Sequence, residues 1–150
     1  MPFEAPHKRV NTSPMYRFIR NKAIKALGFK PTEIMHRDGE RFWPYLYYWD
    51  IGTSSVIILE PKYYSYGPTV TVLVGKLTRA KLDRMGVRLG DNNGLSAEMI
   101  LVSPPRPDRD VHTVDFYWGN HGDGFMKVHF IQSRLFMVEP VFKQIVQGLA

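Results

Sequence analysis

The first regular pattern of apolar and polar positions along the chain is helical and covers residues 13–27. Apolar residues recur there three and four positions apart, while basic residues gather on the opposite side. Ser13 and Pro14 suit the start of a helix, and Gly28 and Pro31 suit its end. The apolar positions are Met15, Ile19, Ala23 and Ala26. This pattern predicts an amphipathic helix that docks by one face and shows positive charge on the other.

Beyond residue 41 the pattern changes to an alternation of period two, in residues that are aromatic or β-branched. Pro44 lies within the first alternating segment, and this would place that strand at an edge of the sheet. The turn at Gly52-Thr53-Ser54 would join the first two strands as a hairpin. The predicted strands are 42–49, 55–60, 69–75, 97–102, 111–118 and 125–132.

Two further helices are predicted. Thr78 can cap a short helix over residues 78–85, and Gly86 can end it. Behind Pro140, apolar residues recur at helical spacing to the end of the chain. The fold class is therefore α+β: an N-terminal basic amphipathic helix, a mainly antiparallel sheet of about five to six strands, and a C-terminal helix packed on the sheet. We expect residues 1–12 to form an extended arm and residues 13–150 to form a single domain.

Composition narrows the chemistry that the chain can carry. It has 150 residues and no cysteine, which excludes disulfides, thiolate catalysis and cysteine-ligated metal centres. The first residues lack the apolar core of a secretory signal, and the longest apolar runs are far too short to span a membrane. The expected setting is therefore intracellular, meaning cytoplasmic, or within a virion, without a membrane.

The net charge of +6 is concentrated at one end of the chain. Residues 1–30 hold seven basic residues and one acidic residue, whereas residues 31–150 hold thirteen of each. Such an arrangement is typical of a protein that holds a polyanion or an acidic partner at one end, although a solvated helix face is the simpler alternative. The candidate contact residues are Lys8, Arg9, Arg17, Arg20, Lys25 and Lys30.

Asp50, Glu60 and Lys62 have the outline of a D…ExK metal-nuclease site, in which two carboxylates bind a divalent metal beside a lysine. In the predicted hairpin, however, Asp50 lies near the turn and Glu60 at the far end of its strand. That separation is too long for a shared metal. Pro61 also removes a backbone donor from the strand. We therefore expect no catalytic site and keep the nuclease as an alternative.

Three histidines, His112, His121 and His129, fall close together with Asp115 and Asp123 among them. A hairpin loop of residues 119–124 would leave Asp115 and His129 on opposite faces, and a loop one residue different in length would bring them together. Isolated histidines on strands usually have a structural role. The sequence therefore predicts no metal site and no cofactor.

The aromatic segment 42–49 suits a contact surface, because rings that alternate along an edge strand cannot all enter the core. Stacking of single-stranded nucleic-acid bases is the alternative use of such rings. The candidate interface residues are Trp43, Tyr45, Tyr47 and Trp49.

These features favour a non-catalytic structural or assembly subunit of a larger complex, such as a phage neck or tail component of a virion or a nucleoprotein particle. Its partners would be other protein subunits, in a homo- or hetero-oligomer, with nucleic acid as a further partner. The alternatives are the metal-dependent nuclease and a free-standing nucleic-acid-binding module. No motif identifies a family, and the sequence leaves the partner and the stoichiometry open.

Overall fold

The structure is a computed structural model that describes residues 14–38, 41–59, 61–90, 96–102 and 111–150, with the backbone alone at 35–38 and 41–45. Among these residues, no helix is both long enough and apolar enough to cross a membrane. The predicted arm of residues 1–12 lies outside the described part of the chain.

Helix α2 spans Pro14–Leu27, as the apolar pattern predicts. Its inner face is buried and its basic face is turned outward, so the helix docks on the rest of the protein by one side. Gly28 has a positive φ of 90° and donates its amide to the carbonyl of Ile24 at 2.8 Å, which ends the helix. The buried residues of α2 are Met15, Tyr16, Ile19 and Ala23.

The described residues form a sheet of nine strands, all paired antiparallel. The strands are β1 Thr32–Asp38, β2 Arg41–Ile51, β3 Ser54–Leu59, β4 Lys62–Tyr64, β5 Gly67–Leu77, β6 Val87–Leu89, β7 Ser96–Ile100, β8 Val111–Trp118 and β9 Gly124–Ile131. Their spatial order is β1-β2-β3-β5-β9-β8-β7-β6, with β4 paired to β5. The long strand β5 thus lies near the centre and joins the two halves of the sheet.

The sheet is larger than the predicted five to six strands for identifiable reasons. Strand β1 forms in a polar segment without clear alternation, and β4 and β6 are only three residues long. The expectation that Pro44 places its strand at an edge is wrong, because β2 lies between β1 and β3. Within β2, only Leu46–Ile51 pair with β3, so Pro44 has no partner on that side among the described residues. The register of β1 with β2 also shifts by one residue beside Pro44. Proline is accommodated at such irregularities.

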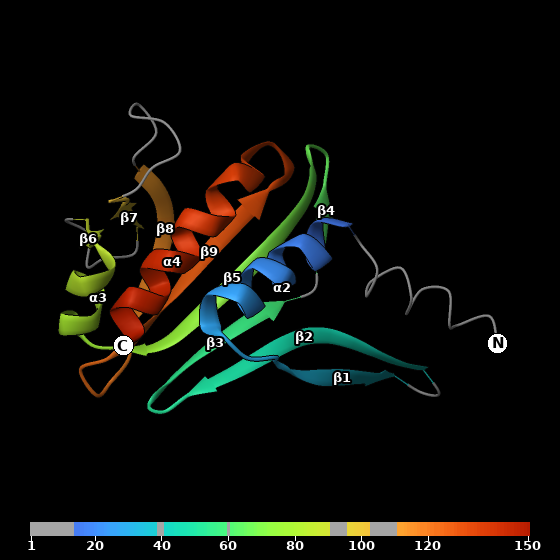
Figure 1. The fold of residues 1–150 in the computed structure, drawn as a ribbon, viewed down its shortest axis with the longest axis horizontal. Coiled ribbons are helices and arrows are strands. Elements are labelled where there is room, and N and C mark those ends of the chain that lie inside the picture. The colour runs from blue at the N-terminus through green and yellow to red at the C-terminus, as the bar shows by residue number, and fades with distance from the viewer. Residues whose placement is uncertain (1–13, 39–40, 60, 91–95, 103–110) are drawn as a thin grey trace.

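The helices α2 and α4 lie side by side across one face of the sheet (Figure 1). Helix α4 spans Val138–Leu149 and follows a 3-10 helix at Gln132–Met137. The short helix α3, Arg79–Met85, packs against α4, with Thr78 as its N-cap and Gly86 at its end. A Cβ atom at Gly148 would collide with the Met85 side chain, so glycine lets α3 and α4 approach closely.

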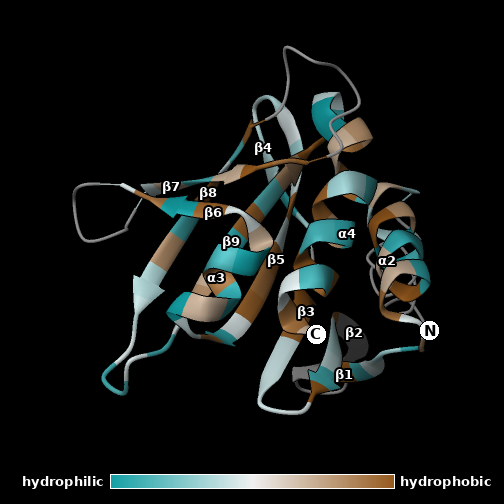
Figure 2. Ribbon diagram, turned by 60° about the vertical axis from the view of Figure 1, so that its left-hand side comes forward, coloured by the Kyte–Doolittle hydropathy of each residue, from teal (hydrophilic) through white to brown (hydrophobic). Residues whose placement is uncertain are grey.

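The core lies between the helices and the inner face of the sheet. Alternate residues of β3, β5, β8 and β9 are buried, and the residues between them are half-buried or exposed. In Figure 2 the apolar residues, coloured brown, are spread along the strands and along α2 and α4. In the described part of the chain, no helix covers the opposite face. The basic side of α2 therefore lies on the helical side of the molecule.

Candidate functional site

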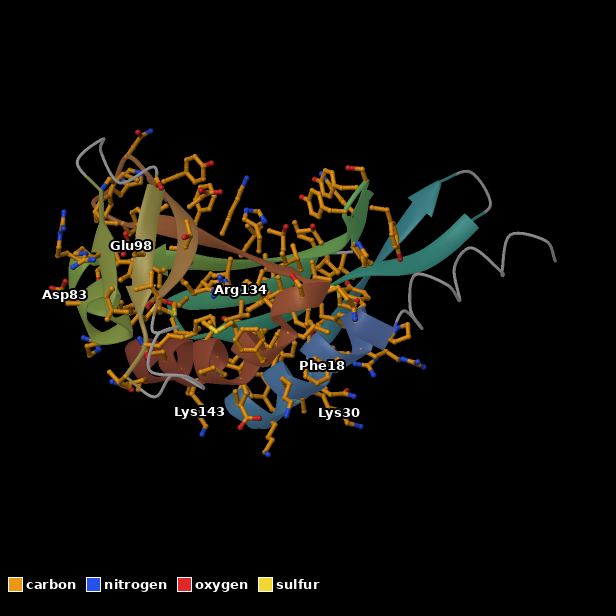
Figure 3. The ribbon with its side chains drawn as sticks, turned by 90° about the horizontal axis from the view of Figure 1, so that it is seen from above. Phe18, Lys30, Asp83, Glu98, Arg134 and Lys143 are labelled. Atoms are coloured by element: carbon orange, nitrogen blue, oxygen red, sulfur yellow. The ribbon has the colours of Figure 1, made fainter. Side chains whose placement is uncertain are left out.

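Basic side chains from α2, from the segment after it and from α4 lie on the helical side of the molecule. Figure 3 shows Phe18, Lys30 and Lys143 together on this side, away from the sheet. We define the basic surface as Arg17, Arg20, Lys22, Lys25, Lys30 and Lys143. The two other residues that the sequence assigns to this contact, Lys8 and Arg9, lie outside the described residues. The basic surface thus contains the four predicted contact residues that the structure describes. It also contains Lys22 and Lys143, which were not among the predicted contact residues.

A carboxylate lies at one edge of the basic surface. The ammonium group of Lys22 on α2 contacts the Glu139 carboxylate on α4 at 2.8 Å. The hydrogen bond from Lys22 and its positive charge lower the pKa of Glu139, and the charges of Lys25 and Lys143 lower it further. These four residues and Ala26 line a hollow of about 260 Å³ between the two helices. Three lysines from two helices therefore surround one carboxylate.

A second hollow, of about 410 Å³, lies on the other side of α2. Arg20 is oriented at its wall, because its guanidinium group lies 5.5 Å from the ring centre of Tyr47 and 3.3 Å from the Tyr47 hydroxyl. Arg20 also donates to the side-chain oxygen of Asn21. The hollow is lined by Arg20, Asn21, Ile24, Lys30, Pro31, Glu33 and Tyr47. Helix α2 is thus a basic ridge between two hollows, each of which contains one carboxylate.

The arrangement can hold anions. Among the described residues, the cations of the basic surface other than Lys22 form no ion pair. Unpaired ammonium and guanidinium groups attract carboxylate or phosphate oxygens, and the attraction is strengthened when several cations share a concave surface.

The residues of the nuclease alternative do not come together. Asp50 pairs with Ser55 at the turn between β2 and β3, whereas Lys62 lies on β4 beyond the other end of β3. Ser55 and Lys62 pair with Gly75 and Thr69 of β5, six residues apart, and at about 3.3 Å per residue this separates the two sites by roughly 20 Å. Glu60 lies outside the described residues.

The histidines are divided between the two faces of the sheet. The hairpin loop is one residue shorter than predicted, since Trp118 pairs with Gly124. As a result, His129 donates from Nε2 to the Asp115 carboxylate at 3.2 Å, and its Nδ1 lies 2.9 Å from the Thr71 hydroxyl. The described residues contain no group of three side chains suited to a metal.

His112 points to the other face and is buried in the core. Its two ring nitrogens have no hydrogen-bond partner within the described part of the chain. Burial and the nearby charge of Arg134 lower its pKa from the ordinary 6.5 to about 4. His121 lies exposed in the hairpin loop. His112 therefore stays neutral in the folded protein near pH 7, and the three histidines do not form one site.

The aromatic prediction requires a correction. Tyr47 and Trp49 are 1% and 0% exposed, so they fill the core and do not present a contact surface. The side chains of Trp43 and Tyr45 lie outside the described part. Among the described residues, the most exposed rings are instead those of Tyr63, Tyr64 and Tyr66, in β4 and the turn that joins it to β5. The rings of Tyr64 and Tyr66 stack with centres 5.3 Å apart.

The amino-acid pattern contains only a partial signal for these groups. Lys22 belongs to the basic end of the chain, but its contact with Glu139 crosses 117 residues, a separation that no local pattern reveals. Lys143 could have been found as the basic position opposite the apolar stripe of the last helix. The exposed tyrosines could have been found because Pro61 and Gly67 bound a strand too short to bury them.

The chain matches no protein-family model, and neither a curated protein nor a solved structure is significantly similar to it.

Proposed function

We propose that this protein is a non-catalytic subunit of a larger assembly and that its basic surface binds an acidic partner. The observation that carries the proposal is the convergence of five cationic side chains from α2, the segment after it and α4 around two hollows whose described linings contain only Glu33 and Glu139 as carboxylates. Clustered cations raise the local concentration of anions and speed their association.

An acidic protein suits the basic surface better than a nucleic acid does. Phe18 and Phe29 are 38% and 47% exposed beside the cations, and protein contacts typically combine apolar rings with charged neighbours. Glu33 and Glu139 interrupt the basic surface, and a continuous phosphate backbone would meet both of them with repulsion.

The exposed tyrosines of the β4–β5 turn are a second contact in this proposal. Tyrosine is favoured at protein interfaces because it combines a large apolar ring with a polar group. The expected setting is a virion, such as its neck or tail, or an intracellular nucleoprotein particle. The non-catalytic part of the proposal is supported by the separation of Asp50 from Lys62.

Fluorescence anisotropy with two labelled probes tests the proposal. The probes are a polyglutamate peptide and a single-stranded oligonucleotide of the same charge, each titrated with the protein at several salt concentrations. We expect the peptide to bind more tightly and its affinity to fall as salt screens the charges. Tighter binding of the oligonucleotide, with a steep salt dependence, would instead indicate a nucleic-acid-binding module. Absence of binding to both probes at low salt would contradict the proposal.

Light scattering of the purified chain then distinguishes an assembly of identical copies from an assembly with a different subunit. A defined oligomer would indicate that copies of this chain supply the acidic surface. A monomer would indicate that a different subunit supplies it.

A further inference from the structure

The hollow between α2 and α4 has an unusual balance of charge. Glu139 accepts a hydrogen bond from Lys22 at 2.8 Å, while Lys25 and Lys143 line the same hollow without an ion partner among the described residues. Three positive charges thus surround one negative charge. The lowered pKa of Glu139 has the charges of all three lysines among its causes, which is consistent with this geometry.

A simple surface ion pair does not account for this arrangement. Such a pair contributes little to stability, because both partners are well solvated and must be held in one geometry. Here the Lys22 and Glu139 side chains are 30% and 46% exposed, so the pair is accessible to solvent and can exchange partners. A second and third lysine beside it would repel each other unless more negative charge arrived.

We propose that the α2–α4 hollow is a binding site for a carboxylate or phosphate group, and that Glu139 occupies it when no ligand is present. This inference rests on the proposed function, since the ligand group would be supplied by the acidic partner. When the ligand binds, its oxygens accept the hydrogen bond of Lys22 and meet Lys25 and Lys143, and Glu139 turns into solvent. The Glu139 carboxylate therefore competes with the partner's anionic group for Lys22. The partner binds only if its anionic group displaces Glu139.

The chain offers matched variants for a test. Glu139→Gln removes the competing charge but keeps an oxygen that accepts from Lys22. Lys25→Gln with Lys143→Gln removes the two cations without an ion partner. Lys127→Gln is the control, because Lys127 lies on β9 with its ammonium group 5.3 Å from the ring centre of Tyr117. Citrate and tripolyphosphate serve as probes and separate a carboxylate from a phosphate preference.

Amide NMR titrations at low ionic strength measure the affinity and show where each probe binds. For Glu139→Gln we expect about fivefold tighter binding, since one nearby like charge is removed from an exposed site. For the Lys25 and Lys143 double variant we expect about tenfold weaker binding. The control should bind within about twofold of the original chain, as expected for a charge outside the hollow. The largest shifts should fall at residues 22–26 and 139–143.

Three results would overturn the inference. Unchanged or weaker binding in Glu139→Gln would show that Glu139 is only a structural ion pair. Shifts outside the α2–α4 hollow would place the anion elsewhere. If neither probe binds to any variant, the hollow is not an anion site. If polyglutamate still binds the basic surface in any of these cases, the proposed function stands while the inference fails.

Discussion

The indole nitrogen of Trp49 donates a hydrogen bond of 2.9 Å to the backbone carbonyl oxygen of Phe29. Trp49 lies on β2 and is completely buried, whereas Phe29 lies just beyond the end of α2. The contact therefore ties the segment after the basic helix to the sheet. An aromatic ring that the sequence assigns to a contact with other subunits instead holds this chain's own helix in place.

Replacement of Trp49 by phenylalanine should destabilise the fold. The variant loses the hydrogen bond to Phe29 and leaves a cavity where the larger ring was, and we expect the free energy of unfolding to fall by about 2 kcal/mol. Urea denaturation measures this change. Trp118→Phe is the matched control, since Trp118 is 37% exposed, and it should have a clearly smaller effect. Equal losses in the two variants would contradict the anchoring role of Trp49.

Gln144 is the second anchor on the helical side. It lies buried on α4, where its amide nitrogen donates to the carbonyls of Met85 and Ile100 at 2.6 Å each, and its oxygen accepts from the Val102 amide at 2.9 Å. Gln144→Leu would leave three backbone groups without partners, so we expect a loss of about 3 kcal/mol in unfolding free energy. Chemical denaturation provides the measurement.

The same helix supplies the control for this prediction. Gln147 is exposed on α4, and Gln147→Leu should change the unfolding free energy by less than about 0.5 kcal/mol. If Gln144→Leu were as harmless as this control, the amide would not hold α4 against the strands.

His112 should make the fold sensitive to acid. Its pKa is lowered from 6.5 to about 4 by burial first and then by the charge of Arg134, so below pH 6.5 the unfolded chain gains a proton that the folded chain does not. The contribution of neutral His112 to the free energy of unfolding is present in full above pH 6.5 and is lost as the pH falls toward about 4. The difference in pKa corresponds to roughly 3 kcal/mol.

The comparison with His112→Leu isolates this effect. Unfolding free energies measured from pH 7.5 to pH 4.5 should fall more steeply for the original chain than for the variant. His121→Gln, in the exposed hairpin loop, should keep the steep dependence of the original chain. Parallel curves for the original chain and His112→Leu would show that His112 does not titrate as described.

The elements that the sequence predicted well are those whose signals are local. Helix α2 ends at Gly28 and α3 is capped by Thr78, because the capping residues act within one turn of the helix. The alternating strands β3, β5, β8 and β9 were found because each buries one face along its length. The strands that were missed lacked such a signal: β4 and β6 are too short to show a period.

The positions of the site residues depend on contacts between residues far apart in the sequence, and no local pattern predicts such contacts. Whether Asp115 meets His129 is decided by one residue in the length of the β8–β9 loop. Alternation placed Tyr47 and Trp49 on the same face of β2, but it could not show that this face would enter the core. The meeting of Lys22 with Glu139 likewise required the packing of α2 beside α4.

The most direct test of the account removes charge from the basic surface and compares the result with an equal removal elsewhere. One variant replaces Arg17, Lys25, Lys30 and Lys143 by glutamine, and the control replaces Lys62, Arg79, Arg88 and Lys127. Each lowers the net charge by four. Anisotropy with labelled polyglutamate at low salt should show binding largely lost in the first variant and retained in the control. Equal losses in the two variants would show that binding follows net charge alone and would contradict a specific basic surface.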